Sequence, residues 1–84
     1  NGDGKNDVLD LRNLCYNANS VVFVIKNRDN SILFETTDPS EVIWYGKDKS
    51  GKLLPSPSFV YLYLEIIRQD GSKKRYLETI TVLY

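Results

Sequence analysis

A run of six apolar residues, Phe59 to Leu64, constrains the fold of this chain more than any other feature. Side chains in a strand alternate between two faces, and both faces of this run are apolar. A strand with one solvated face would alternate apolar and polar residues, so the run predicts a central strand covered on both sides. Trp44 precedes Gly46, where the chain must turn, and we expect its indole to pack onto this central strand and close one end of the core.

Short strands and turn signals alternate along the rest of the chain. Proline, glycine, asparagine and aspartate interrupt the β-branched and aromatic segments every 8–12 residues. We expect strands at residues 8–11, 20–26, 31–36 and 41–45, then the central strand and a terminal strand at 76–84. This spacing predicts one domain, residues 1–84, with an all-β, immunoglobulin-like antiparallel β-sandwich fold of about six to seven short strands. A small barrel is the alternative.

Two hairpins carry predictions of register. If residues 27–30 form the whole first loop, Ile25 faces Ile32. The second hairpin turns at Asp70-Gly71, a strong hairpin signal. A two-residue turn there would oppose Leu64 to Leu77, whereas one bulged residue would oppose Leu62 to Ile80. We favour the bulged register because it pairs more apolar surface.

Composition and charge exclude several classes of function. The 11 Lys and Arg residues balance 11 Asp and Glu, so general attraction to nucleic acid or anionic membrane is not expected. The longest apolar runs are far short of the ~20 residues that span a bilayer. The chain has no His and one Cys, Cys15, which excludes the common His-dependent catalytic arrangements and Cys/His zinc sites. We therefore expect a protein that is not an enzyme, with Cys15 as a half-buried structural thiol.

The first residues, NGDGKND, are rich in glycine and acidic or amide side chains, as calcium loops are. Asn1, Asp3, the Lys5 carbonyl and Asp7 could ligate Ca²⁺, although the bidentate glutamate of a full calcium loop is lacking. A solvated turn is the alternative, and no other cofactor is expected. Because the chain begins without Met, we expect it to be a segment of a longer protein.

Two further patterns have both structural and functional interpretations. The basic run Lys73-Lys74-Arg75 is typical of a solvated strand edge that resists aggregation, and the alternative is a receptor contact. Aromatic residues at alternating strand positions are usually core or cross-strand pairs, and the alternative is a carbohydrate platform. The residues concerned are Trp44, Tyr45, Tyr61 and Tyr63.

An ordered set of short motifs resembles a known family. The motifs are Asn1–Asp7 (NGDGKND), Val24–Arg28 (VIKNR), Leu33–Glu35 (LFE), Trp44–Gly46 (WYG), Gly51–Pro55 (GKLLP) and Ile80–Leu83 (ITVL). In this order they resemble the gliding-motility-associated C-terminal domain of Bacteroidetes proteins, the type B sorting domain of the type IX secretion system. The chain departs from the family pattern at Asp29-Asn30, Pro57, Glu78 and Tyr84, where the family commonly has Trp-Gly, Gly, Gly and a basic residue.

The resemblance implies a sorting signal. Such domains direct an attached upstream cargo protein through the periplasm and the type IX outer-membrane translocon, with its shuttle proteins, to the cell surface or medium. The terminal strand and its basic neighbours are the residues we expect the translocon to recognise: Lys73, Lys74, Arg75, Tyr76, Ile80, Val82 and Tyr84. An adhesive or carbohydrate-binding module of the same fold is the alternative, and an exposed aromatic row on one sheet would favour it.

Overall fold

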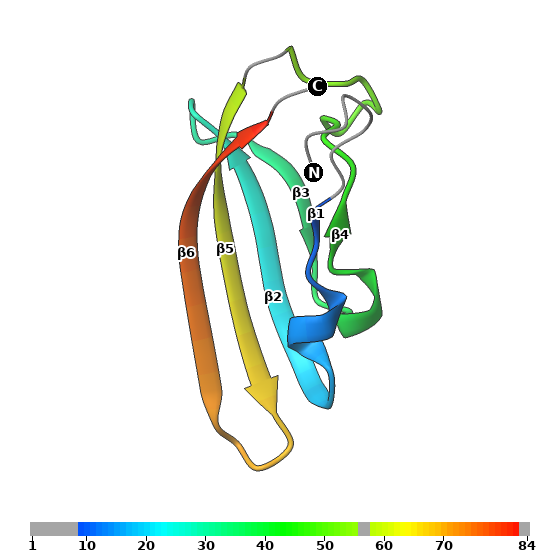
Figure 1. Ribbon diagram of the computed structural model, residues 1–84, viewed down its shortest axis with the longest axis vertical. Coiled ribbons are helices and arrows are strands. Elements are labelled where there is room, and N and C mark those ends of the chain that lie inside the picture. Colours follow the sequence, from blue (N-terminus) through cyan, green and yellow to red (C-terminus); the bar gives the residue numbers. More distant parts are fainter. Residues whose placement is uncertain (1–8, 56–57, 83–84) are drawn as a thin grey trace.

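The computed structural model describes residues 9–55 and 58–82. They form six strands and two short 3₁₀ helices, in the order β1 (Leu9–Asp10), η1 (Arg12–Cys15), β2 (Ala18–Asn27), β3 (Ile32–Thr36), η2 (Pro39–Glu41), β4 (Ile43–Trp44), β5 (Ser58–Arg68) and β6 (Lys73–Val82). A four-stranded antiparallel sheet has the strand order β3-β2-β5-β6, and β1 pairs antiparallel with β4 in a second sheet (Figure 1). The prediction of an all-β antiparallel sandwich is confirmed.

The core lies between the two sheets, on what we call the inner face of the larger one. Every second side chain of the two middle strands points to this face and is buried: Val21, Phe23 and Ile25 of β2, and Val60, Leu62, Leu64 and Ile66 of β5. Cys15, Val42, Trp44 and Leu54 join the buried cluster from the opposite layer, and Leu33 of β3 and Val82 of β6 complete it. The run that starts at Phe59 therefore forms part of a middle strand, and Trp44 is buried in the core as predicted.

The smaller sheet covers only part of the larger one. Figure 1 shows β1 and β4 beside β3 and β2, away from β6. Consequently the inner side chains in the middle of β6 are less buried than those of β2 and β5: Tyr76 and Ile80 are half-buried, and Glu78 is exposed, whereas Val82 at the end of the strand is buried.

The outer face of the larger sheet has no second layer among the described residues. Phe59 is 43% exposed and Tyr61 47% exposed, and Tyr63 is half-buried. The prediction that this strand is covered on both sides is therefore wrong. Aromatic rings supply apolar surface, and tyrosine adds a hydroxyl that tolerates solvent, so an apolar pattern did not require a covering layer here.

Three hairpin loops share one backbone design, at residues 27–31, 48–52 and 68–72. In each loop the first residue donates its N–H to the carbonyl of the last, at 2.8, 2.9 and 2.9 Å. The fourth residue donates its N–H to the carbonyl of the first, at 2.9, 3.0 and 3.0 Å. That fourth residue is Asn30, Gly51 or Gly71, with φ of 75°, 88° and 87°. These are three-residue loops in which a type I turn precedes a left-handed residue, a conformation that glycine and asparagine tolerate best.

Both register predictions are wrong. The three-residue loop sets the register of the last hairpin, whereas in the first hairpin a β-bulge adds a further shift of one residue. Ile25 lies opposite Phe34, because the register shifts next to Lys26. In the last hairpin Leu62 lies opposite Glu78. The favoured register differs from the observed one by two residues. Because side chains alternate between the faces with a period of two, this difference leaves Ile80 on the inner face, where it lies opposite Val60.

A repeated Asp-x-Ser pattern closes four turns, and the sequence analysis did not identify it. In each copy the aspartate Oδ1 accepts a hydrogen bond from the serine backbone N–H, at 2.8–3.0 Å. The copies are Asp29–Ser31, Asp38–Ser40, Asp48–Ser50 and Asp70–Ser72. The recurring spacing in the sequence was sufficient to find them, because aspartate commonly bonds the backbone two residues on.

These turns predict loss of stability in acid. Hydrogen bonds from serine lower the pKa of all four aspartates, and hydrogen bonds from Arg12 lower the pKa of Asp10 to about 2. A depressed folded-state pKa contributes stability above the unfolded pKa of 3.8, and that contribution disappears as pH falls through the folded value. We expect the urea midpoint to be lower at pH 2.5 than at pH 6. Replacing the four turn aspartates together with Asn should reduce this difference, and an unchanged difference would contradict the assignment.

Candidate functional site

Strand β6 forms one edge of the four-stranded sheet, because β5 is its neighbour on one side and no described strand pairs with the other. The Ser72 carbonyl points toward β5, where it accepts from Arg68 at 2.9 Å. Backbone direction alternates along an antiparallel strand, so the odd-numbered residues from Lys73 to Thr81 direct their N–H and C=O groups outward. Such an edge can accept an added strand.

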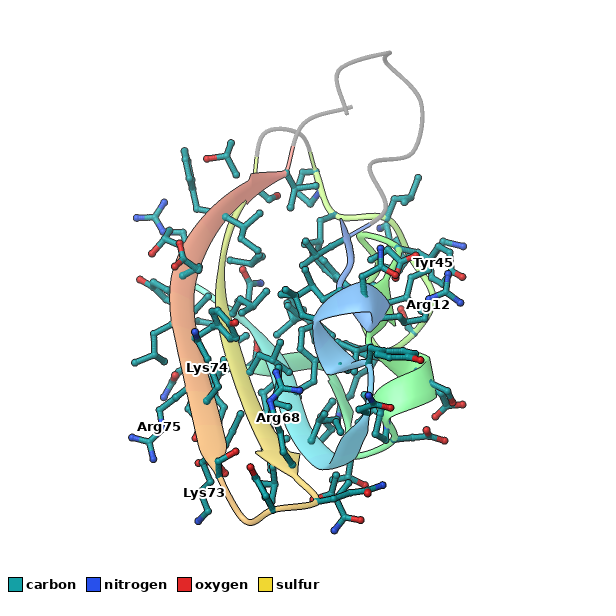
Figure 2. All side chains as sticks on the ribbon, turned by 60° about the horizontal axis from the view of Figure 1, so that its bottom comes forward. Arg12, Tyr45, Arg68, Lys73, Lys74 and Arg75 are labelled. Atoms are coloured by element: carbon teal, nitrogen blue, oxygen red, sulfur yellow. The ribbon has the colours of Figure 1, made fainter. Side chains whose placement is uncertain are left out.

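The basic run at the start of β6 does not form a single patch. Arg75 lies opposite Glu65, and its Nη2 is 3.3 Å from a Glu65 carboxylate oxygen. Lys74 points to the inner side, where its Nζ lies 5.7 Å from the centre of the Tyr76 ring. Figure 2 shows Lys73 and Arg75 projecting on one side of β6 and Lys74 on the other. A partner that contacts one face therefore meets only part of this charge.

Most of the remaining residues that were expected to contact the translocon have side chains that pack in or against the hydrophobic core. Tyr76 and Ile80 pack against the core, and Val82 belongs to it. Tyr84 lies outside the described residues. An added strand could contact this part of β6 through the backbone, whereas the Val82 side chain is buried.

The outer face carries an apolar groove beside the aromatic row. Its volume is about 360 Å³, and Val24, Tyr61, Tyr63 and Leu77 are among the residues that line it. Leu77 comes from β6 and is 68% exposed, the largest value among these apolar side chains. Leu77 was considered from the sequence only as a hairpin partner and not as an exposed residue. Its neighbours at alternate positions, Lys73, Arg75 and Thr79, are charged or polar, and this pattern predicts that its face of the strand is exposed. At the end of the row, the Arg28 guanidinium lies 5.7 Å from the centre of the Phe59 ring.

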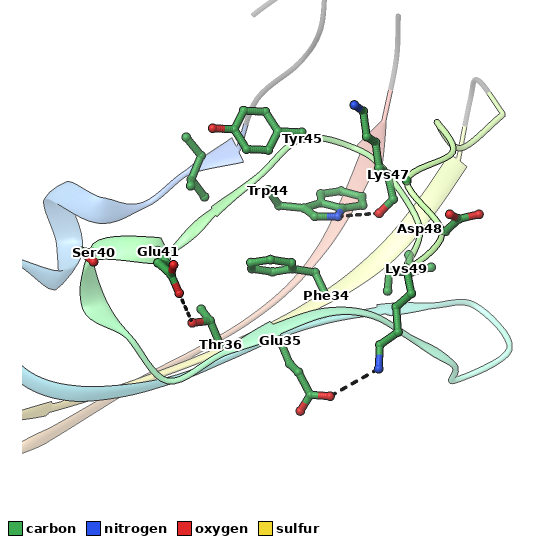
Figure 3. Close-up of a pocket in the computed structure, with 13 residues that line it drawn as sticks. Phe34, Glu35, Thr36, Ser40, Glu41, Trp44, Tyr45, Lys47, Asp48 and Lys49 are labelled. Atoms are coloured by element: carbon green, nitrogen blue, oxygen red, sulfur yellow. Dashed lines mark hydrogen bonds and ion pairs between the residues drawn. The ribbon is translucent and has the colours of Figure 1, made fainter.

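A larger pocket of about 680 Å³ opens between β3 and β4. Figure 3 shows the Phe34 ring and the Trp44 indole on the facing sides of these two strands. Trp44 Nε1 donates to the Lys47 carbonyl at 3.0 Å, so the indole is held in place. Tyr45, the next residue, is exposed and lines the same pocket.

Four of the charged side chains at this pocket, Glu35, Glu41, Asp48 and Lys49, already have partners within the chain. Glu35 lies 3.7 Å from Lys49 Nζ, and Asp48 accepts the hydrogen bonds of its own turn. Thr36 Oγ1 is 3.5 Å from the Glu41 carboxylate. These contacts tie the end of β3 to the loops on either side of β4 and leave an apolar cleft with a charged rim (Figure 3).

The predicted metal and thiol residues have different outcomes. Asn1, Asp3, Lys5 and Asp7 lie outside the described residues, so the calcium site stays a prediction. Across residues 9–55 and 58–82, no three His, Cys, Asp or Glu side chains gather as metal ligands would. Cys15 is buried in the core and not half-buried as expected, and this burial raises the pKa of its thiol, which fits a structural role.

Comparison with known protein families, with characterised proteins and with solved structures finds no match to this chain. The family therefore stays a prediction from the motifs. Among the described residues, no helix has the length and apolar character to cross a bilayer.

Proposed function

We propose that this chain is a non-enzymatic sorting domain of the type B class, which directs an attached cargo protein through the type IX secretion system to the cell surface or medium. The free edge of β6 is the observation that carries the proposal, because it offers outward backbone groups for strand addition. The ordered motifs from Asn1 to Leu83 supply the link to this export system. The translocon and its shuttle proteins are the proposed partners.

Recognition through the backbone fits the burial of this strand. Ile80 and Val82 contact the core, so a receptor that reads their side chains would have to displace them. A receptor that adds a strand uses the outward N–H and C=O groups and leaves the core intact. The side chains of the same odd-numbered residues, such as Thr79, lie on the outer face of the sheet and would contribute specificity for the receptor.

The test is an export assay with a point substitution in β6. Residues 1–84 are fused to a neutral carrier in a host with a working type IX system, and the carrier is measured in the periplasm and at the surface or in the medium. Thr79→Pro removes one outward N–H, and the matched control Thr79→Ala keeps it. Deletion of the whole strand is less informative, because it would also remove Val82 from the core.

We expect export of the intact fusion and of Thr79→Ala, and a several-fold loss for Thr79→Pro. Circular dichroism of the purified domains checks that all three are folded. Retention of the intact fusion in the periplasm would contradict the sorting function. Full export of a folded Thr79→Pro variant would contradict recognition at this edge.

The aromatic row on the outer face favours a second candidate, an adhesive or carbohydrate-binding module. Phe59 and Tyr61 are exposed along one strand beside the outer groove, and exposed aromatic rings can pack against the apolar faces of sugars. A glycan array probed with the wild type and with Tyr61→Ala tests this function. We expect binding that the substitution removes, and a wild type that binds no glycan would contradict it.

A further inference from the structure

The edge of β6 that no described strand covers has a symmetric pattern of backbone groups around Leu77. Its outward backbone groups belong to the odd-numbered residues, and Leu77 stands at the centre of that series. Leu77 is exposed, and it lies opposite Tyr63 on the outer face. A large exposed leucine in the middle of a long free edge is the feature that natural edge strands usually avoid.

We propose that a second copy of this chain pairs with β6, antiparallel, around a two-fold axis at Leu77. The two four-stranded sheets then join into one continuous sheet. Because the same surface is used by both copies, the contact is isologous and closes at two subunits. This inference goes beyond the proposed function and does not depend on it.

Backbone direction restricts the registers available to such a dimer. Outward-pointing groups must meet outward-pointing groups, and the outer faces must stay on the same side of the joined sheet. Both conditions hold when odd-numbered residues of one copy oppose odd-numbered residues of the other. The midpoint between two odd residue numbers is a whole number, so the two-fold axis passes through a residue and not between two residues. With the axis at Leu77, residues 73–81 of each strand are paired.

Charge selects among the remaining registers. An axis at Arg75 would oppose two guanidinium groups, and an axis at Glu78 would oppose two carboxylates, both of which are unfavourable. The Leu77 axis opposes Arg75 to Thr79 of the second copy. On the inner side it places Glu78 opposite Tyr76 of the second copy and diagonal to both Lys74 and Glu78 of the second copy, so the lysines offset the proximity of the two carboxylates. Parallel pairing in register would instead place the basic runs of the two copies side by side.

The outer groove supports the same axis. Tyr63 and Leu77 line this groove, and the two-fold brings Leu77 against Leu77 of the second copy. The apolar stripe then continues from one outer face to the other. An axis at Tyr76 would pair only residues 73–79 and would oppose Leu77 to Arg75, which leaves the two leucines out of direct contact.

Cysteine cross-linking tests the axis directly. In the proposed dimer the two Leu77 Cα atoms are about 5.5 Å apart, within the range of a disulfide. The matched control is Thr79→Cys, on the same strand and face, because the two copies of residue 79 lie about 13 Å apart along the strands. Cys15 is buried, so the wild type serves as the background for oxidation.

We expect wild-type domain to show concentration-dependent dimers in sedimentation velocity. Under mild oxidant Leu77→Cys should convert to a covalent dimer, whereas Thr79→Cys and wild type should not. Lys74→Glu should weaken the dimer about tenfold, because two symmetry-related pairs change, and Lys74→Glu with Glu78→Lys should restore it. A monomer at all concentrations, or equal cross-linking of the two cysteine variants, would overturn the proposal.

Discussion

Replacing Phe23 with alanine is expected to lower the free energy of unfolding by about 3–5 kcal/mol. Phe23 is fully buried in a middle strand, opposite Leu64, and its ring meets the Phe34 ring edge-on with centroids 5.8 Å apart. The substitution removes a large apolar side chain and leaves a cavity between the two sheets. A chain of this length has a total stability of about 4–12 kcal/mol, so the substitution should remove a large share of it.

The matched control is Phe59→Ala, the same substitution on the outer face. Phe59 is half solvent-exposed and touches Arg28 through its ring, so we expect a loss below about 1 kcal/mol. Urea titration followed by the fluorescence of Trp44 measures both variants. Equal losses for the two phenylalanines would contradict the assignment of the inner and outer faces.

Replacing Trp44 with alanine is expected to lower the free energy of unfolding by about 3–5 kcal/mol as well. Trp44 is 4% exposed and belongs to the smaller layer, where it forms part of the core and a wall of the pocket beside Phe34. Its Nε1 bond to the Lys47 carbonyl also holds the start of the hairpin loop at residues 48–52, where Lys47 and Leu53 form a β-bridge. The variant therefore loses both buried area and the anchor of that hairpin.

The neighbouring aromatic residue supplies the control for this prediction. Tyr45 is 52% exposed, so Tyr45→Ala should cost below about 1 kcal/mol. Trp44→Phe should lie between the two, because it keeps an aromatic ring but loses the N–H donor. Urea titration followed by circular dichroism is the measurement, since Trp44 is the sole tryptophan. A small effect of Trp44→Ala would mean that the smaller layer contributes little to the core.

The two proposals for β6 involve the same backbone groups. Pairing with a receptor and pairing with a second copy therefore exclude one another at any moment. A dimer would hide the edge until a receptor of higher affinity, or dilution, displaced the second copy. Leu77 would contribute to the dimer, whereas the export signal would depend on the backbone of the whole strand.

Local sequence patterns were sufficient to predict where strands form. The β-branched run in residues 20–26 and the apolar run from Phe59 both lie in long strands, and the turns at Pro39 and Asp70-Gly71 are present. The burial of Trp44 was also predictable. These features depend on neighbours a few residues away, so a single sequence contains the information that determines them.

The tertiary structure decided the registers, the exposed face and the place of each charge. Three-residue loops, closed by specific backbone hydrogen bonds, shifted both hairpins from the predicted registers, and a β-bulge next to Lys26 shifted the first hairpin further. Alternation along a strand already places Lys74 and Arg75 on opposite faces of β6. However, only the pairing with β5 decided which of them is on the inner side and that Arg75 meets Glu65. The apolar pattern of β5 specified two apolar faces, and only the position of the smaller sheet determined which face became the core. A residue's neighbours along the chain set its backbone preference, whereas its burial depends on which other layer packs against it.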